Sequence, residues 1–495
     1  MKQYAAHQLD FYKTGHAAQY PKGTESVYAN FTMRSGNHSN VPNSKGGYIG
    51  GMQLFYKAIL QDLWNDTFFN ERKDKAVERF LRRIVGGISS FDFIEARTRM
   101  GALHELGYLP IVIKSLTEGS FVPYKVPYIT IRETIPEFFW VSQMLESVMS
   151  TYTWPMINTM TTAAEFLRVA YQSAKLTGGN MNFVPYQIHD FSYRGMFGGE
   201  AGAMSGLAML LAGVRGTDSV SALDLAEDYY DAFYNDIGGS IPATEHSVMC
   251  AGGKEHEFET FVRFITEVYP KGNVSIVSDT WDYWNVMGNF LPRLKPFIDA
   301  REGTVVFRPD SGDPVKIICG DPSSDNMYAR KGTHNCLWDV FGGEVNSKGY
   351  KALNPKVNYI YGDSITLDRQ QRIYQGLQGQ GYCPPVVLGV GSYSLQGNST
   401  RDTHGIAMKA TNTICNGESI EIFKDPITDD GVKKSLKGLV MVSQAGYTYT
   451  VQDQVTPKQE ARGCLKVVFK DGRLECEVSL DEVRRRVTNH ILKQI

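Results

Sequence analysis

YQIHDFSYRG (186–195) is a short apolar run that ends in a polar turn, and helical spacing of apolar residues follows it at 199–211. Five more runs of this kind follow before residue 395: SIPATEH (240–246), NVSIVSDTWD (273–282), TVVFRPDSGDP (304–314), NYIYGDS (358–364) and VVLGVGSYS (386–394). Helices are expected between them at 255–268, 283–299 and 367–378. Alternation of strands with helices favours a parallel sheet, and in a (β/α) barrel the functional groups lie at the carboxyl ends of the strands. Because His, Asp, Arg and Gly residues collect at these six ends, we predict one shared site there.

The sequence changes character on both sides of this region. Before it, a helix is expected at 70–85, strands at 109–114 and 126–132, and a polar loop at 36–47. After it, short strands are expected at 405–409, 419–423, 438–442, 447–451, 465–469 and 474–478, with an Asp-Gly turn at 471–472 and a closing helix at 480–494 capped by Ser479. We therefore predict an α/β fold, with a barrel domain over 151–400 and a second, mainly antiparallel α+β domain built from both chain ends, 1–150 and 401–495.

The composition excludes several classes of protein. The 495 residues are 42% apolar and 21% charged, which is typical of a globular chain of about three domains. The 51 basic and 53 acidic residues leave a net charge of −2, without the basic surplus that nucleic-acid binding requires. No apolar run reaches the roughly 18 residues of a membrane span, and the N-terminus lacks the apolar core of a signal peptide. Seven scattered cysteines without a CxxC pair argue against a disulfide framework, so we expect a cytoplasmic protein bound to neither nucleic acid nor membrane.

The residues at the six strand ends, with cations that follow them, suit a ligand that carries phosphates and a planar ring. Cations bind phosphate, glycines allow close backbone approach, carboxylates accept from ribose hydroxyls, and an aromatic side chain stacks on a ring. The candidates are Arg194, Arg308, Arg401 and Lys409; Gly362, Gly389 and Gly391; Asp279, Asp310, Asp363 and Asp402; and Phe191 and Tyr193 beside His189. The alternative is that each Arg forms a structural salt bridge and each Asp caps a helix, above all Asp190 and Asp402.

Signatures of other chemistries are missing from the sequence. It contains no P-loop, no complete GxGxxG and no GxSxG elbow, and it lacks the acidic signature of the common flavodoxin-like phosphoribosyltransferases. Paired carboxylates could serve a glycoside hydrolase, but this many cations would have no use on a neutral sugar. Cys319, His334 and Cys336 lie near one another in sequence, but no second cysteine pair completes a zinc site, so no resident metal is expected.

A series of ordered motifs resembles the nicotinamide phosphoribosyltransferases, a family of type II phosphoribosyltransferases, over nearly the whole chain. The motifs are DFYKTGHAAQYP (10–21), FTMR (31–34), HDFSYRG (189–195), RGTD (215–218), SIPATEHS (240–247), VSIVSDTWD (274–282), RPDSGDP (308–314), NSKGYK (346–351), GD (362–363), TRD (400–402) and FKDP (423–426). The resemblance implies an irregular (β/α) barrel and a homodimer with shared active sites. It also implies the formation of nicotinamide mononucleotide from nicotinamide and phosphoribosyl pyrophosphate, with ATP as co-substrate.

The resemblance also implies a role for each matching residue. Phe191 and the partner's Tyr12 would stack on the two faces of the nicotinamide ring, and Asp218 and Ser275 would contact its amide. Arg308 and Asp310 would contact ligand and ribose, Asp279 would lie near the reacting carbon, and His246 would accept a phosphoryl group from ATP. The phosphate and ribose contacts would be Arg194, Gly362, Asp363, Gly391 and Ser392 of one chain with Arg34, Arg401 and Lys409 of the other. Ser392 stands where the family usually has glycine.

Elementary chemistry agrees with this reading. A pyridine nitrogen is already a nucleophile, so the site needs no general base, and its work is to align the ring with the anomeric carbon and to neutralise the leaving pyrophosphate. Mg²⁺ bound mainly through the substrate phosphates would assist that departure. Three alternatives stay open: a nicotinate phosphoribosyltransferase, a non-catalytic binding protein on the same scaffold, and a barrel hydrolase acting on a nucleotide. Asp218 argues against the first, because a fixed carboxylate repels a second carboxylate.

Overall fold

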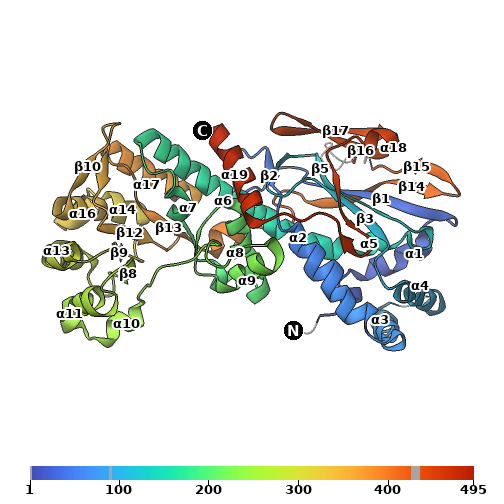
Figure 1. Cartoon of the computed structure of the whole chain (residues 1–495), viewed down its shortest axis with the longest axis horizontal. Helices are drawn as coiled ribbons and strands as arrows, with labels where there is room; N and C mark the ends of the chain where they lie inside the picture. Colours follow the sequence, from blue (N-terminus) through green and yellow to red (C-terminus); the bar gives the residue numbers. More distant parts are fainter. Residues whose placement is uncertain (1–2, 89–91, 398, 425–434) are drawn as a thin grey trace. The chain divides into compact units, whose positions relative to one another are not determined.

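The computed structural model describes residues 3–88, 92–397, 399–424 and 435–495, and Figure 1 shows its helices and strands. The chain divides into two compact units. Unit 1 contains Met1–Thr161, Leu225–Phe233 and Ser399–His490, and unit 2 contains Thr162–Asp224, Tyr234–Asn398 and Ile491–Ile495. The motif FKDP (423–426) continues beyond residue 424 and so lies partly outside the described residues.

Unit 2 is built on a curled parallel sheet of six strands. Its order is β7-β6-β13-β12-β9-β8, and the strands are β6 (Ile188–Asp190), β7 (Gly216–Thr217), β8 (Val274–Val277), β9 (Val305–Arg308), β12 (Val357–Tyr361) and β13 (Val387–Val390). Every pairing in this sheet is parallel. Most of these strand residues are buried, as expected for a parallel sheet covered by helices. The predicted α/β fold is confirmed.

The segment at 240–246 differs from its predicted strand conformation. Together with the preceding Gly239 it makes only two isolated parallel bridges, Gly216 with Gly239 at one edge of the sheet and Ala243 with Ser275 at the other. Pro242 has no amide hydrogen, so it cannot donate to a ladder, although its carbonyl accepts from the Ser275 amide at 2.8 Å. Because the two bridges join β7 and β8 through this one segment, the sheet curls into an irregular barrel.

Helices follow the strands of unit 2 where the sequence predicts them. They include α8 (Gly199–Ala212), α11 (Glu257–Arg263) with η8 (Phe264–Val268), α12 (Tyr283–Asn285) with η9 (Val286–Phe290) and α13 (Leu291–Ala300), and α17 (Leu367–Gly379). The apolar stretch that begins near residue 203 is buried on all sides of α8, which is why it has no polar face. Between β9 and β12 the chain adds α14 (Pro314–Cys319), α15 (Met327–Lys331), α16 (Thr333–Phe341) and a hairpin of β10 (Gly343–Val345) and β11 (Lys351–Leu353).

Unit 1 holds a seven-stranded antiparallel sheet to which both chain ends contribute. Its order is β15-β14-β1-β5-β3-β18-β19, and the strands are β1 (Thr24–Thr32), β3 (Ile111–Ser115), β5 (Pro127–Glu133), β14 (Ala407–Cys415), β15 (Glu418–Glu421), β18 (Lys466–Lys470) and β19 (Arg473–Leu474). The β18–β19 hairpin turns at Asp471 and Gly472, whose φ angles of 47° and 77° are those of the predicted Asp-Gly turn. Two smaller antiparallel pairs are β2 (Gly46–Tyr48) with β4 (Phe121–Pro123), and β16 (Leu439–Ala445) with β17 (Thr448–Val455).

Two helices of unit 1, α3 (Lys73–Gly87) and α19 (Leu480–Gln494), lie where the sequence predicts them, and the others were not predicted. The others include α1 (His16–Gln19), α2 (Met52–Leu54), α4 (Phe93–Leu106) and α5 (Val141–Met144). The long helix α6 (Glu146–Thr177) and the closing helix α19 each begin in this unit. The Ser479 hydroxyl accepts from the Glu482 amide at 3.3 Å, so the predicted cap of α19 is present.

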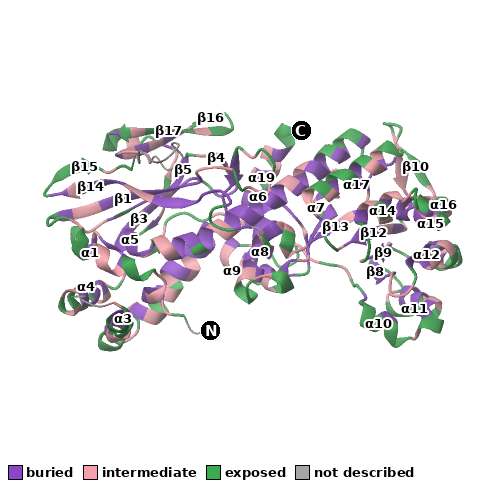
Figure 2. Cartoon of the chain, turned by 180° about the vertical axis from the view of Figure 1, so that it is seen from behind, coloured by how far each residue is buried: buried purple, intermediate pink, exposed green. Residues whose placement is uncertain are grey.

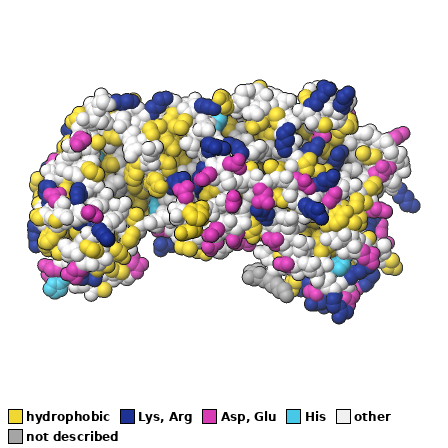
Figure 3. Space-filling view, in the orientation of Figure 1, with side chains coloured by type: hydrophobic (Ala, Val, Ile, Leu, Met, Phe, Trp, Pro, Cys, Tyr) yellow, Lys and Arg dark blue, Asp and Glu magenta, His cyan; other side chains and the backbone are white. Residues whose placement is uncertain are grey.

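Figure 2 shows which elements are buried, and Figure 3 shows how charge is distributed over one face of the surface. In Figure 2, the strands β1, β5 and β14 of the unit 1 sheet and the helix α6 are largely buried, whereas β15 and the outer faces of α3 and α4 are exposed. Figure 3 shows basic and acidic side chains mixed over the visible face, in line with the near-zero net charge. In the part of the chain that the structure describes, no helix combines the length and the apolar composition that crossing a bilayer requires.

Candidate active site

A cavity of about 530 Å³ lies within unit 2 at the barrel strands. Its walls include Phe191, Asp218, Ser275 and Arg308, four of the residues that the sequence assigns to the nicotinamide ring, its amide and the ribose. Three of them lie at the carboxyl ends of strands (Phe191 after β6, Asp218 after β7 and Arg308 at the end of β9), whereas Ser275 lies within β8. The barrel therefore brings together residues that are more than a hundred positions apart. A cavity of this volume is typical of small-molecule sites.

The ring of Phe191 packs against the backbone of two glycines, Gly362 and Gly389. A Cβ atom added to Gly389 would lie 2.3 Å from Cδ2 of this ring, and one added to Gly362 would lie 2.6 Å from Cε2. Only glycine therefore allows the ring to lie against β13 and the end of β12. The guanidinium of Arg308 is 5.4 Å from the ring centroid and donates to Asp310 at 2.8 Å. The assignment of Gly362 to a ribose phosphate stays a prediction, because the contact that the structure shows for Gly362 is with the Phe191 ring.

The carboxylate of Asp218 is held by a histidine at the wall of the cavity. His189 Nε2 lies 2.9 Å from Asp218 Oδ1, and the His189 ring is 5.0 Å from that of Phe191. Partial burial alone would raise the pKa of Asp218, but the hydrogen bond and charge of His189, with smaller contributions from Ser240 and Arg308, lower it below its usual value. Ser275 Oγ is buried without a hydrogen-bond partner among the described residues, and it lines the same cavity. The site therefore offers an ionised acceptor and a hydroxyl to a ligand.

A second group of residues joins the ends of β8 and β9. Asp279 Oδ2 accepts from the Asp310 amide at 2.9 Å and from Ser311 Oγ at 2.6 Å. Its other oxygen is buried without a hydrogen-bond partner in the described part of the chain and lies 3.8 Å from His246 Nε2. His246 Nδ1 lies 3.3 Å from Thr280 Oγ1. Asp279 and Thr280 therefore face the His246 ring, whereas Glu245 accepts from Ser247.

The loops predicted to hold phosphate adjoin one another in unit 2. Arg194 is exposed in the short turn η6 (Tyr193–Gly195). A Cβ added to Gly195 would lie 2.0 Å from Ser392 Oγ, which places the loops of residues 194 and 392 in contact. A Cβ added to Gly391 would meet nothing within 4 Å, so its backbone is open to a ligand. Asp363 follows β12 and is exposed.

The remaining predicted phosphate contacts lie together in unit 1. Burial lowers the pKa of Lys409, and the charges of Arg34, Lys424 and Arg401 lower it further against the opposing effect of Glu146. Arg34 Nε donates to the carbonyl of Gly405 at 2.7 Å. An anion bound among these cations would offset the repulsion that acts on Lys409.

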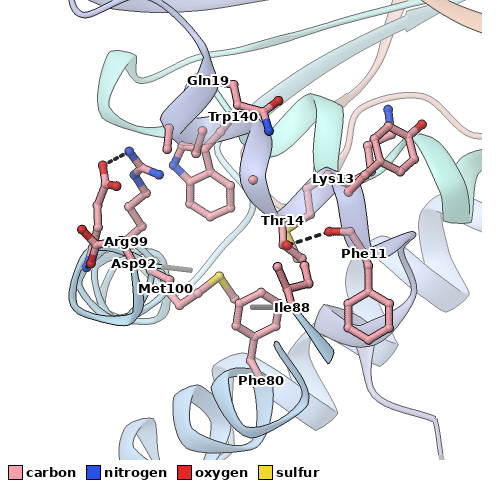
Figure 4. A pocket seen from close by; sticks show the side chains of 17 residues that line it. Phe11, Lys13, Thr14, Gln19, Phe80, Ile88, Asp92, Arg99, Met100 and Trp140 are labelled. Carbon is pink, nitrogen blue, oxygen red and sulfur yellow. Dashed lines mark hydrogen bonds and ion pairs between the residues drawn. The ribbon is translucent and has the colours of Figure 1, made fainter. Parts of the chain in front are cut away.

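Tyr12 lies in unit 1 as well, on a different feature. It lines a cavity of about 410 Å³ whose walls are largely apolar and include Phe80, Met100 and Trp140 (Figure 4). The cations of that cavity, Lys13 and Arg99, already pair with Glu146 and Glu95. The Tyr12 side chain is 60% exposed. Apart from Tyr12, this cavity holds none of the predicted site residues, so the candidate active site is the one in unit 2.

Sequence reasoning missed three contacts at the site. It noted His189 beside Phe191 without a role, and it did not single out Thr280 or Ser311. The signal for His189 was its place at a strand end, but its partner Asp218 lies 29 residues away, so only the parallel pairing of β6 with β7 brings them together.

The structure also shows the surroundings of the other candidate residues. Asp190 is fully buried and accepts from the Ser192 amide, Ser192 Oγ, Thr217 Oγ1 and Ser219 Oγ, so it ties the ends of β6 and β7 together. His334 pairs with the Tyr359 hydroxyl at 3.0 Å, and burial raises the pKa of the Cys319 and Cys336 thiols to about 12. Asp402 lies 3.7 Å from Arg401, as in a surface ion pair. No cluster of three or more metal-binding side chains occurs among the described residues.

Comparison with known proteins places the chain in a family. The sequence model of the nicotinate phosphoribosyltransferase (NAPRTase) family matches residues 186–473. A nicotinamide phosphoribosyltransferase from Acinetobacter baylyi is 46% identical over 497 residues, which cover 98% of this chain and 97% of that protein. The chain belongs to the nicotinate phosphoribosyltransferase (NAPRTase) family. The prediction of an enzyme of the phosphoribosyltransferase class is thereby confirmed.

Other NAPRTase-family relatives and solved structures agree. A nicotinamide phosphoribosyltransferase from Mycoplasma pneumoniae is 32% identical over 449 residues, covering 87% of this chain and 93% of that one. The fold is shared with a nicotinate-nucleotide pyrophosphorylase from Pyrococcus furiosus, with a TM-score of 0.59, 14% identity and coverage of 100% and 99% of the two chains. Human nicotinic acid phosphoribosyltransferase has the same fold, with a TM-score of 0.55, 14% identity and coverage of 97% and 93%.

Proposed function

We propose that this NAPRTase-family enzyme is a nicotinamide phosphoribosyltransferase of NAD salvage. The pyridine nitrogen of nicotinamide forms a bond to C1 of phosphoribosyl pyrophosphate while the bond from C1 to the pyrophosphate oxygen breaks, which yields nicotinamide mononucleotide and pyrophosphate. The observation that carries the proposal is the Asp218 carboxylate at the wall of the cavity that also contains Phe191. The names of the relatives from Acinetobacter and Mycoplasma agree with it.

The base pocket favours an amide over a carboxylate. The ring of nicotinamide stacks on Phe191, its NH₂ group donates to Asp218, and Ser275 supplies a hydroxyl to the amide. Nicotinate would place a second carboxylate near Asp218, and two such charges about 4 Å apart repel by roughly 4 kcal/mol at an effective dielectric near 20, before solvent screening reduces the effect. Arg308 does not offset this repulsion freely, because Asp310 already engages it.

The reaction needs charge stabilisation rather than proton transfer. Positive charge that develops on the ribose ring is stabilised by the carboxylates of Asp279 and Asp310, and the cations neutralise the phosphates. The fit of a magnesium ion rests on the buried, unpartnered Oδ1 of Asp279 and the neighbouring Asp310, two hard oxygen donors that Mg²⁺ prefers. Mg²⁺ would arrive mainly on the substrate phosphates and supply neutralising charge for the leaving pyrophosphate.

We assign energy coupling to His246. Its ring is half-exposed, and Thr280 lies at hydrogen-bond distance from Nδ1. When Nδ1–H donates to Thr280, the lone pair is on Nε2, which attacks the γ-phosphorus of ATP while the bond from that phosphorus to the bridging oxygen breaks and ADP leaves. The test is the variant His246→Ala, for which we expect no ATP hydrolysis but residual, ATP-independent synthesis of nicotinamide mononucleotide. ADP release at the wild-type rate by this variant would contradict the assignment.

We also propose a homodimer whose active sites are shared. Tyr12 is exposed and would cover the second face of the nicotinamide ring in the partner's site, and the cation group of Arg34, Arg401 and Lys409 would bind phosphates there. The positive charges of Arg34, Lys424 and Arg401 lower the pKa of Lys409, which favours an anionic ligand at this group. The purified protein should elute as a dimer in size-exclusion chromatography with light scattering. A monomer with full activity would contradict the shared site.

The experiment that tests the proposed reaction is direct turnover. Protein incubated with phosphoribosyl pyrophosphate, Mg²⁺ and nicotinamide should release equal amounts of pyrophosphate and nicotinamide mononucleotide. Phe191→Ala, which removes the stacking ring, should lose most of this activity. His256→Ala, which changes an exposed histidine, is the control and should retain the activity. Tight binding of nicotinamide without product would favour the non-catalytic binding protein, and release of phosphate from a nucleotide would favour the hydrolase.

A further inference from the structure

His189 is the residue in the base pocket to which no role has been assigned. It is the middle residue of β6, pairs in register with Gly216 of β7 and Gly389 of β13, and is only 8% exposed. A Cβ added to Gly216 would lie 2.5 Å from His189 Nδ1, so the imidazole lies directly against the backbone of β7. The ring has little freedom to turn, because glycine backbone lies on one side and Phe191 is near its edge.

The hydrogen bond between His189 and Asp218 has a defined direction. A carboxylate only accepts, so Nε2 of His189 donates to Asp218 Oδ1, and the neutral ring must have its proton on Nε2. This bond uses one lone pair of the carboxylate, and the carboxylate has further lone pairs that can accept from a ligand. The backbone amide of Asp218 donates to the carbonyl of Asp190 at 3.1 Å, so both ends of the residue are tied to β6.

The other charged groups near His189 are paired. Arg308 of β9 donates to Asp310, and Arg215, which directly precedes β7, pairs with Asp236 at 2.5 Å. Asp190, the next residue of β6, is enclosed by four donors, and Tyr186 of α7 (Val184–Gln187) is the remaining titratable side chain of the cavity. Ordinary carboxyl, guanidinium and phenol groups keep their charge state between about pH 5.5 and about pH 8.5, whereas histidine changes its own in this range.

We propose that His189 is a specificity-determining residue, which positions Asp218 for the amide and sets the net charge of the base pocket. The inference rests on the proposed function. With neutral His189 the pair carries one negative charge, which accepts the amide NH₂ and repels nicotinate. With protonated His189 the pair has no net charge, and the repulsion of nicotinate is lost. Selectivity for nicotinamide over nicotinate therefore falls as the pH falls.

The first test is the pH dependence of the selectivity ratio, which is kcat/KM for nicotinate divided by kcat/KM for nicotinamide, measured by competition. The ratio cancels the steps that both bases share, including the binding of phosphoribosyl pyrophosphate and the phosphorylation of His246. We expect the wild-type ratio to rise at least about tenfold from about pH 8.5 to about pH 5.5, while nicotinate stays ionised.

Two variants separate the roles of position and charge. His189→Gln keeps an N–H donor near the place of Nε2 but cannot be protonated, so its ratio should change less than about twofold over the same pH range. His189→Phe keeps the size of the ring without the donor, and we expect KM for nicotinamide to rise about tenfold with a smaller change in kcat, since a charge-assisted hydrogen bond is lost. The KM for nicotinamide of the glutamine variant should lie close to the wild-type value. His256→Gln, an exposed histidine, is the matched control and should keep the wild-type pH dependence.

The outcomes are distinct. A flat wild-type ratio, or a glutamine variant with the pH dependence of the wild type, overturns the proposal while leaving the proposed function intact. If His189→Phe does not fold, as shown by circular dichroism, the pH profile of the glutamine variant still decides. Absence of turnover of both bases by the wild type at every pH would overturn the proposed function itself, and the role of His189 with it.

Discussion

The substitution Gly389→Ala tests whether the packing of Phe191 against glycine backbone controls binding of the base. The new Cβ would lie 2.3 Å and 2.4 Å from two carbons of the Phe191 ring and 2.9 Å from the Cα of Gly362. Carbon atoms normally approach to about 3.5–4.0 Å, so the ring must move by more than about 1 Å. Overpacking of this kind costs about 1–3 kcal/mol. Because about 1.4 kcal/mol corresponds to a factor of ten, KM for nicotinamide should rise about fivefold to about a hundredfold.

The assay is the initial rate of pyrophosphate release at varied nicotinamide. KM for phosphoribosyl pyrophosphate should change much less, because the displaced ring faces the base. Gly379→Ala is the matched control, since an added Cβ there would meet nothing within 4 Å at the end of α17. A Gly389→Ala enzyme that folds and keeps KM for nicotinamide within about twofold of the wild type would refute the reasoning, because the clash would then have no effect on the base.

Three further predictions concern the amide contact, a buried carboxyl and the shared site. Asp218→Asn should raise KM for nicotinamide about tenfold to about a hundredfold and admit nicotinate, as measured by competition, and unchanged selectivity would remove Asp218 from this role. Burial raises the pKa of Glu133 to about 7, above its unfolded value, so the carboxyl stays protonated in the folded state and stability falls by about 3 kcal/mol as the pH rises from about 4.5 to about 7. Glu133→Gln should flatten this decrease in urea midpoints, and an undiminished slope would contradict it. Inactive Arg34→Ala chains mixed with inactive Phe191→Ala chains should recover activity in heterodimers, and confirmed heterodimers without activity would exclude a site shared between subunits.

Strand positions in the barrel region were predictable because their pattern is local. Short apolar runs that end in polar turns predicted β6, β8, β9, β12 and β13 within a few residues. The failure at 240–246 has a local cause as well, since Pro242 interrupts the donors of a ladder and only two bridges form. The same segment closes the barrel, and that closure depends on its partners in β7 and β8, which no local pattern contains.

The sequence singled out residues that the structure brings together, but it did not predict their contacts. Phe191, Asp218, Ser275 and Arg308 line one cavity as the sequence predicts. The packing of Phe191 against glycine backbone, by contrast, depends on how β12 and β13 lie beside β6. His189 contacts Asp218 only because β6 pairs with β7. Local spacing cannot reveal such contacts, because each joins residues from different strands of the sheet.

The most direct test of the central claim is one competition experiment with both bases. The purified protein receives phosphoribosyl pyrophosphate, Mg²⁺, ATP and equal concentrations of nicotinamide and nicotinate near pH 8, and the products are identified by mass spectrometry. The account predicts nicotinamide mononucleotide with pyrophosphate, and little nicotinate mononucleotide. Nicotinate mononucleotide as the main product would contradict the role of the Asp218 carboxylate, and the absence of both nucleotides would contradict the proposed reaction.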